Sequence, residues 1–388
     1  MLKLKYKYWF LVMQFLTVAK LVQAQNDSLV VDFNGQVQAW STFQFEKPFV
    51  IQPGARFVPT LLGKYNVGTK TTFDAEASLA LDGNVTVEDW KKTDASVDFK
   101  PYRIWARYAS DKFEVRAGLQ KINFGQAKMF RPLMWFDGMD VRDPLQLTDG
   151  VTGILAKYFF ENNANLWAWG LIGNDKRKGW EMFATEKWKP EVGGRIELPV
   201  LKGELAISTH YRKISAYNVV SSYWPTTTLL NENKIGLDGK WDIGAGVWFE
   251  SSTTISQKNN ILVPRFQDMW NVGVDYTFPL GNGLGVTLEY LRYHAGDEFV
   301  VSGNSMHLVG SMLNYPMSLT DNVSLLFFYV PGQNSLFNYA SWTRTYDNWS
   351  IYAIGFWNPT NATMLSFQAN SKNIFAGKGM QLMLSYNF

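Results

Sequence analysis

The sequence contains no cysteine. A disulfide framework, a thiolate metal site and a cysteine nucleophile are therefore excluded. The chain has only three histidines, His210, His294 and His307, and their spacing matches neither a metal-binding motif nor a catalytic triad. We therefore expect no metal site, no cofactor and no enzymatic activity.

Long apolar runs are also missing after residue 24. A membrane-spanning helix needs a run of about eighteen or more apolar residues, and no later segment reaches that length. Apolar residues at helical spacing are scarce as well. Helical membrane spans are therefore not expected in residues 25–388.

The first 24 residues have the order of a secretory signal peptide. Lys3, Lys5 and Lys7 precede an apolar stretch over residues 8–18, and a Val-Gln-Ala end closes at Ala24. This order predicts export with cleavage after Ala24. A membrane anchor is the alternative, but no stop-transfer run follows the segment.

The positive net charge comes from this leader. It holds four lysines and no acid, so the 37 basic and 34 acidic residues of the chain become 33 and 34 after its removal. A nucleic-acid partner is therefore not expected. Residues 25–388 also show no Pro/Ser linker and no charge block, which indicates a single domain.

Alternation at period two recurs along residues 25–388. One segment sets Phe73, Ala75, Ala77, Leu79 and Leu81 against Asp74, Glu76 and Ser78, and the last sets Met380, Leu382, Leu384, Tyr386 and Phe388 against Gln381, Met383, Ser385 and Asn387. Strands with lipid on one face and water on the other are expected to alternate in this way. The fold class predicted is all-β, a transmembrane antiparallel β-barrel.

Eighteen candidate strands follow from this pattern, with sixteen as the alternative count. Tight joints near residues 68, 110–111, 162–163, 202–203, 242–243, 282–283, 321–322 and 347–348 alternate with longer segments near 46–53, 83–93, 122–149, 174–189, 214–231, 255–267, 295–304, 331–337 and 358–377. Such alternation is typical of barrels with short periplasmic turns and long outer loops. Pro101 predicts a bulge, and residues 361–376 are long enough for another hairpin.

The carboxy terminus carries a family resemblance. The end Tyr386-Asn387-Phe388, after an alternating strand, resembles the assembly signal of outer-membrane proteins of Gram-negative bacteria. The resemblance implies that the barrel-insertion machinery reads Tyr386 and Phe388. The whole plan resembles the porin superfamily of sixteen- and eighteen-stranded channels.

A second resemblance concerns the longest loop. The segment from Arg116 to Gly125, followed by Arg131-Pro132 and Arg142-Asp143-Pro144, resembles the strand and long loop of porin-like and exopolysaccharide-export barrels. In porins this loop folds into the barrel and narrows it. The resemblance implies the same role for residues 122–149 here.

An eighteen-stranded barrel is too wide for its side chains to fill. We therefore expect a water-filled channel narrowed by the loop over residues 122–149, with its apolar residues against the wall and its charges toward the pore. A surface loop packed on itself is the alternative. The loop charges expected to face the pore are Lys128, Arg131, Asp137, Asp140, Arg142 and Asp143.

Charged residues of the strands are predicted to face the lumen as well. By alternation these are Lys100, Arg103, Arg107, Arg116, Lys157, Arg195, Arg212, Lys234 and Lys240 on the basic side, and Asp74, Glu76, Glu114, Glu197, Glu204, Asp238, Glu250, Asp275 and Glu289 on the acidic side. Opposed rows of charge sort solutes by charge and dipole. The basic cluster at Lys100, Arg103, Arg107 and Arg116 favours a stretch that attracts anions, unless these residues pair with Glu114 and Asp98.

Two functions follow for an integral protein of the outer membrane. The first is a porin for passive diffusion of small polar solutes, in contact with outer-membrane lipid and assembled alone, as a homotrimer or in a larger complex. The second is a non-conducting barrel that serves an assembly, export or adhesion machine. Its aromatic-rich outer loops, near residues 217–229 and 261–270, would then bind a partner.

Overall fold

The computed structural model describes residues 29–145, 147–217, 227–257, 263–299, 305–360 and 375–388. These residues form a closed barrel of eighteen strands, which are β1 (Leu29–Gln44), β2 (Val50–Val67), β3 (Thr71–Glu88), β4 (Lys91–Ala109), β5 (Phe113–Gln120), β6 (Val151–Phe159), β7 (Asn165–Leu171), β8 (Glu191–Val200), β9 (Gly203–Tyr217), β10 (Thr227–Asp242), β11 (Gly246–Ser256), β12 (Phe266–Phe278), β13 (Leu284–Gly296), β14 (Ser305–Pro316), β15 (Asp321–Val330), β16 (Ser335–Thr345), β17 (Trp349–Trp357) and β18 (Lys378–Asn387). The predicted signal peptide lies outside the described residues. The prediction of an antiparallel eighteen-stranded barrel is confirmed, and the alternative of sixteen strands is wrong.

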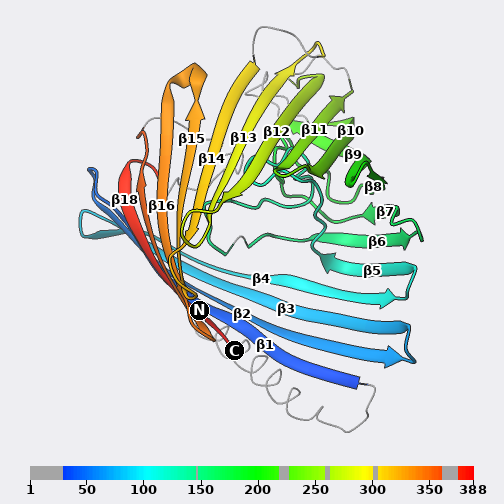
Figure 1. Ribbon diagram of the computed structural model, residues 1–388, viewed down its shortest axis with the longest axis horizontal. Coiled ribbons are helices and arrows are strands. Elements are labelled where there is room, and N and C mark those ends of the chain that lie inside the picture. Colours follow the sequence, from blue (N-terminus) through cyan, green and yellow to red (C-terminus); the bar gives the residue numbers. More distant parts are fainter. Residues whose placement is uncertain (1–28, 146, 218–226, 258–262, 300–304, 361–374) are drawn as a thin grey trace.

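Each strand pairs antiparallel with the next, and β18 closes the ring on β1 (Figure 1). In the closing pair Gln36 lies opposite Asn387, and Gln44 lies opposite Gly379. Among the described residues no helix is long and apolar enough to cross a membrane. The only helical turn described is a short 3-10 segment, Pro331–Gln333.

Side-chain exposure in the barrel is the reverse of that in a water-soluble protein. Outward apolar side chains such as Ile207 and Val272 are about half exposed, whereas inward Ser208 and Ser385 are buried. Large apolar areas on a protein surface mark contact with another apolar phase. The outward face therefore suits lipid, and the inward face is polar.

The connections match most of the expected ones. Each of the eight predicted tight joints has a short turn at or next to it, but the turn expected at 321–322 lies at 317–320, because Asp321 and Asn322 already belong to β15. The bulge predicted at Pro101 is present, because Ser78 pairs with Arg103 while Leu79 pairs with Pro101. The hairpin considered over residues 361–376 lies almost wholly outside the described residues. Most of the outer loop near 217–229 also lies outside the described residues. Of the segment near 261–270, only residues 261–262 do, and Phe266 to Trp270 belong to strand β12 instead of a loop.

One predicted loop is wrong. The segment expected as a loop over residues 83–93 is strand up to Glu88 and again from Lys91. Only Asp89 and Trp90 connect the two strands, and both have positive φ, as a tight two-residue hairpin requires. Neither residue is the glycine or asparagine that usually signals such a turn, so composition favoured a longer loop.

Candidate functional site

The connection between β5 and β6, residues 121–150, is here called the long loop, and it is fastened to the inner wall by two carboxylates. The first is Glu250 of β11. It accepts hydrogen bonds from the backbone N–H groups of Gln126 and Ala127, both at 2.8 Å, and of Leu133 at 2.5 Å. Gly125 is required beside it, because its φ is +94° and a Cβ would lie 2.5 Å from Glu250 Oε2.

The second carboxylate is Glu289 of β13. Its oxygens accept hydrogen bonds from the N–H groups of Lys128 at 2.5 Å, Met129 at 3.1 Å and Phe130 at 2.9 Å. The amide of Asn271 on β12 donates to the same carboxylate at 3.3 Å. Glu250 and Glu289 thus accept hydrogen bonds from backbone donors that a loop inside a barrel could not give to another strand.

Apolar contacts add to this fastening. Trp135 and Phe136 pack in one buried cluster with side chains of β6 and β7, and the indole N–H of Trp135 donates to Ser252 at 2.9 Å. Met129 and Phe130 lie in a second cluster with side chains from β12 to β17. On β10, Gly236 makes room for Leu133, since a Cβ there would lie 2.3 Å from Leu133 Cδ2.

The charges of the long loop divide into buried and accessible ones. Arg131 and Asp137 form an ion pair of 3.3 Å in which both side chains are almost fully buried. They brace the loop internally and do not face open space, in contrast to the expectation that the loop charges point to the pore. Lys128 is part-exposed and pairs with Asp275 of β12.

The second half of the long loop reaches other parts of the wall. Arg142 pairs with Asp140 at 2.6 Å and donates to the Tyr339 hydroxyl of β16 at 3.5 Å. Burial raises the pKa of Asp143, against the opposing effects of the Leu145 N–H and of Arg56 on β2. The loop therefore has contacts on β11 to β13, on β16 and near β2.

The loop returns to the wall at β4. Lys100 pairs with Asp149 at 2.7 Å, and Arg103 donates to the Thr148 carbonyl at 2.8 Å. Burial alone would raise the pKa of Asp149, but the Lys100 ammonium holds it below its usual value. Two of the four clustered basic residues thus fasten the loop end.

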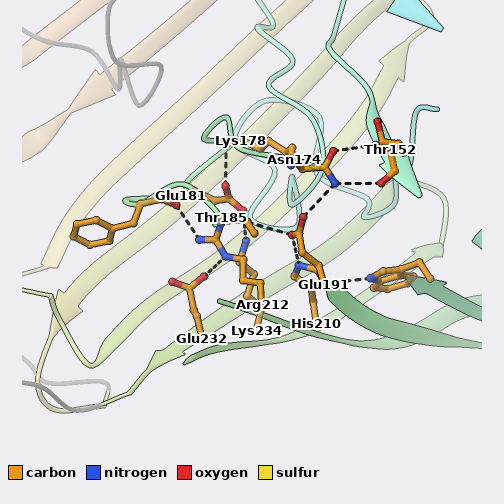
Figure 2. A network of polar contacts seen from close by, with 12 residues as sticks. Thr152, Asn174, Lys178, Glu181, Thr185, Glu191, His210, Arg212, Glu232 and Lys234 are labelled. Carbon is orange, nitrogen blue, oxygen red and sulfur yellow. Dashed lines mark hydrogen bonds and ion pairs between the residues drawn. The ribbon is translucent and has the colours of Figure 1, made fainter. Parts of the chain in front are cut away.

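A second loop, residues 172–190 between β7 and β8, also lies against the inner wall, which no sequence pattern predicted. Glu181 at its centre contacts Arg212 of β9 at 2.8 Å and Lys234 of β10 at 2.7 Å (Figure 2). Arg212 also contacts Glu232 at 2.5 Å. Burial would raise the pKa of Glu181, but the two cations outweigh it and lower the pKa to about 2. In the sequence, the one hint of this contact is that Arg212 and Lys234, both predicted to face inward, require an anionic partner.

His210, one of the three histidines, has structural partners. Nε2 of His210 lies 3.2 Å from Glu191, and its Nδ1 accepts from the Trp169 indole at 3.1 Å. Ser208, on the same strand face, accepts from Arg195 at 3.1 Å. Within the described residues no group of three or more side chains could hold a metal ion.

The wall strands β2 to β5 keep part-exposed charges. Arg107 makes a bidentate pair with Asp74, with its Nε at 2.8 Å and its Nη2 at 2.5 Å, and reaches Glu114 at 3.3 Å. Arg116 donates to the other oxygen of Glu114 at 3.2 Å. These side chains are 13–28% exposed, whereas the pair of Arg195 and Asp238 on β8 and β10 is 1% exposed.

The predicted wall charges thus fall into two groups. Those on β8 to β13 are largely covered by the two loops, whereas Asp74, Arg107, Glu114 and Arg116 on β3 to β5 remain part-exposed. Arg103 on β4 is buried under the loop end, and Lys157 on β6 is part-buried. Arg107 and Arg116 pair with Asp74 and Glu114, so Asp74 takes the place that Asp98 was considered for. That the predicted wall charges line a pore stays a prediction.

The last residue is built into the barrel closure. The backbone N–H of Phe388 donates to the Gly35 carbonyl, and the Gly35 N–H donates to the Phe388 carbonyl, both at 3.1 Å. The Phe388 ring lies 5.6 Å from the ring of Phe33 and 6.1 Å from that of Phe57.

Solved structures of outer-membrane proteins share this fold. No protein-family model and no curated protein sequence matches the chain. OccAB4 of Acinetobacter baumannii aligns with a TM-score of 0.55 at 9% identity, over 94% of this chain and 100% of that one. OccAB1 of the same organism gives 0.54 at 9% identity, over 95% and 98%. OmpT of Vibrio cholerae, an outer-membrane protein in trimer form, gives 0.52 at 13% identity, over 93% and 100%.

Proposed function

We propose that this chain, which has the barrel fold of outer-membrane porins, is a porin of a Gram-negative outer membrane for passive diffusion of small polar solutes. The observation that carries the proposal is the fastening of the long loop inside the barrel by Glu250 and Glu289. A loop held by several buried hydrogen bonds has a defined position. It narrows the lumen to a passage of fixed size.

The solute path runs beside the uncovered charges of β2 to β5. Arg107, Asp74, Glu114 and Arg116 form a ladder of alternating sign there. Charges of both signs set a local field without a large net potential. We therefore expect weak selectivity between anions and cations, and a preference for polar over apolar solutes of the same size.

The outward face supports the membrane location. Apolar side chains cover it, and residues 1–24 have the order of an export signal. Assembly by the barrel-insertion machinery would use Tyr386 and Phe388. A homotrimer is the assembly we expect first, because a structurally similar outer-membrane protein is described in trimer form.

A non-conducting accessory barrel is the second candidate. The specific observation in its favour is that residues 172–190 occupy the interior together with the long loop. Two inner loops cover more of the lumen than one, and full closure would leave no path.

Planar-bilayer recording separates the two functions. The leader-free protein, refolded and checked for a folded barrel by its heat-dependent gel mobility, is added to a bilayer in symmetric salt. A porin gives stable, resolved conductance steps and a small reversal potential in asymmetric salt. A folded barrel that gives no steps contradicts the porin proposal and favours the accessory role.

A further inference from the structure

The strands from β3 to β8, which form one sector of the barrel, differ sharply in length. Strands β3 and β4 have 18 and 19 residues, whereas β5, β6, β7 and β8 have 8, 9, 7 and 10. Figure 1 shows the long ribbons of β3 and β4 beside the shorter ones of β5 and β6. Strand β4 pairs with β5 only from Ile104 to Ala109. Its first part, Lys91 to Asp98, pairs with β3 on one side and has no strand neighbour on the other among the described residues.

This free edge, Lys91–Asp98, is open to solvent. Every one of its residues is exposed, and Val97 is 78% exposed. The N–H of Ala95 donates to the carboxylate of its own neighbour Asp94, at 2.9 Å, instead of to a strand carbonyl. Alternate backbone groups of β4, at Ala95 and Val97, therefore point to the open side.

The opposite border of the same sector is covered by the chain itself. On β9, Ile214 forms a β-bridge with Thr185 of the 172–190 loop. The N–H of Ser215 donates to the Ala184 carbonyl at 3.2 Å, and the N–H of Glu186 donates to the Lys213 carbonyl at 2.9 Å. An added segment thus satisfies the β9 edge, whereas no described segment does so for β4.

The free edge lies beyond the lipid in a membrane-inserted barrel. A transmembrane strand needs about 9–11 residues. Counted from the short turn after Ala109, that length ends near Phe99, so Lys91–Asp98 projects on the side of the long loops. The backbone N–H and C=O groups of this edge can therefore form hydrogen bonds with water, so the edge is stable without a partner. They can also pair with the backbone of an added strand.

We propose that Lys91–Asp98 is a docking edge for an extended segment of another protein, which adds to β4 as an antiparallel strand. The side chains from Asp94 to Asp98 define the partner, since Lys91 and Lys92 lie at the hairpin end of the edge, next to the turn. Asp94 and Asp98 share the inward face, because their β3 partners Thr86 and Asp82 point inward, and Ala95 and Val97 share the outward face. The partner segment therefore alternates basic and apolar residues.

A second copy of the chain does not fit this edge. Two barrels inserted in the same direction and related by a two-fold axis along the membrane normal would cross their strands at twice the strand tilt, roughly 70–90°. Strands at that angle cannot form a hydrogen-bonded ladder.

Register-dependent disulfide formation tests the proposal, because the natural chain has no cysteine and an introduced one is therefore unique. The Ser96→Cys variant, refolded in detergent, is mixed with an eight-residue peptide of alternating valine and lysine that carries one cysteine as a mixed disulfide. Strand pairing raises the effective thiol concentration only when the peptide cysteine lies on the lysine face. We expect exchange about tenfold faster or more for this peptide than for one with cysteine on the valine face.

Two controls decide how the rates are read. Adding Val97→Pro removes an edge N–H and should abolish the difference between the peptides, whereas Val97→Thr should keep it. Equal rates for both peptides, or a difference that survives Val97→Pro, contradict the proposal. If the thiol of the Ser96→Cys variant is already shielded from a hydrophilic maleimide without peptide, the proposal is also contradicted, because the chain would then cover its own edge.

Discussion

Replacement of Glu250 by alanine should release the long loop from the wall. The carboxylate accepts three loop N–H groups, from Gln126, Ala127 and Leu133. Each buried donor left without an acceptor costs about 1–3 kcal/mol, so the change destabilises the docked loop by about 3–9 kcal/mol. Since about 1.4 kcal/mol corresponds to a tenfold change in an equilibrium constant, even the lower bound shifts docking by roughly 10².

Liposome swelling with neutral sugars of increasing size measures the effect. We expect Glu250→Ala to admit larger sugars than the unchanged protein, while heat-dependent gel mobility still reports a folded barrel. Glu114→Gln is the matched control, because it removes a wall carboxylate whose partners Arg107 and Arg116 lie on the wall. An unchanged size limit in a folded Glu250→Ala barrel, or the same increase with Glu114→Gln, would refute the role of the carboxylate in fixing the passage.

Three further predictions concern other parts of the interior and the terminus. In Gly236→Val the new side chain would occupy the space of Leu133, so we expect it to displace the long loop and lower the free energy of unfolding by about 1–3 kcal/mol. The measurement is the unfolding midpoint. Gly332→Val is the control, because a Cβ at Gly332 meets no other atom within 4 Å. The pKa of Glu181 is lowered to about 2 from an unfolded value of 4.5, which stabilises the 172–190 loop by about 3 kcal/mol above pH 4.5. This stabilisation is lost as the pH falls from 4.5 through 2, so cleavage of the loop by a protease should increase over that range. An increase in cleavage between pH 5 and 8 would contradict the assignment. Phe388→Ser, which removes ring contacts with Phe33 and Phe57, should lower the fraction of heat-modifiable barrel assembled in cells, and unchanged assembly would exclude a role for this ring.

The strands could be predicted because their signal is local. In a barrel with lipid outside and polar groups inside, alternation appears in each strand separately, as in Phe73 to Leu81, and short turns alternate with longer connections. The hairpin at Asp89-Trp90 was missed because its turn lacks glycine and asparagine, although both residues adopt positive φ.

The interior of the barrel could be predicted only in part. The length of the segment over residues 122–149 indicated a functional loop, but its fastening joins residues far apart in sequence, such as Gln126 and Glu250. Nothing local marks a wall glutamate as an acceptor for loop backbone. The same holds for Glu181, whose cations lie on β9 and β10.

The central claim, an open channel narrowed by the long loop, is tested most directly by chemical modification of one loop residue during single-channel recording. Lys128 is part-exposed in the lumen, and the chain has no cysteine, so Lys128→Cys offers a unique thiol. We predict that a bulky, charged thiol reagent added to an open Lys128→Cys channel lowers the current in discrete steps and leaves the unchanged protein unaffected. Full modification of the thiol with no change in current would contradict the account.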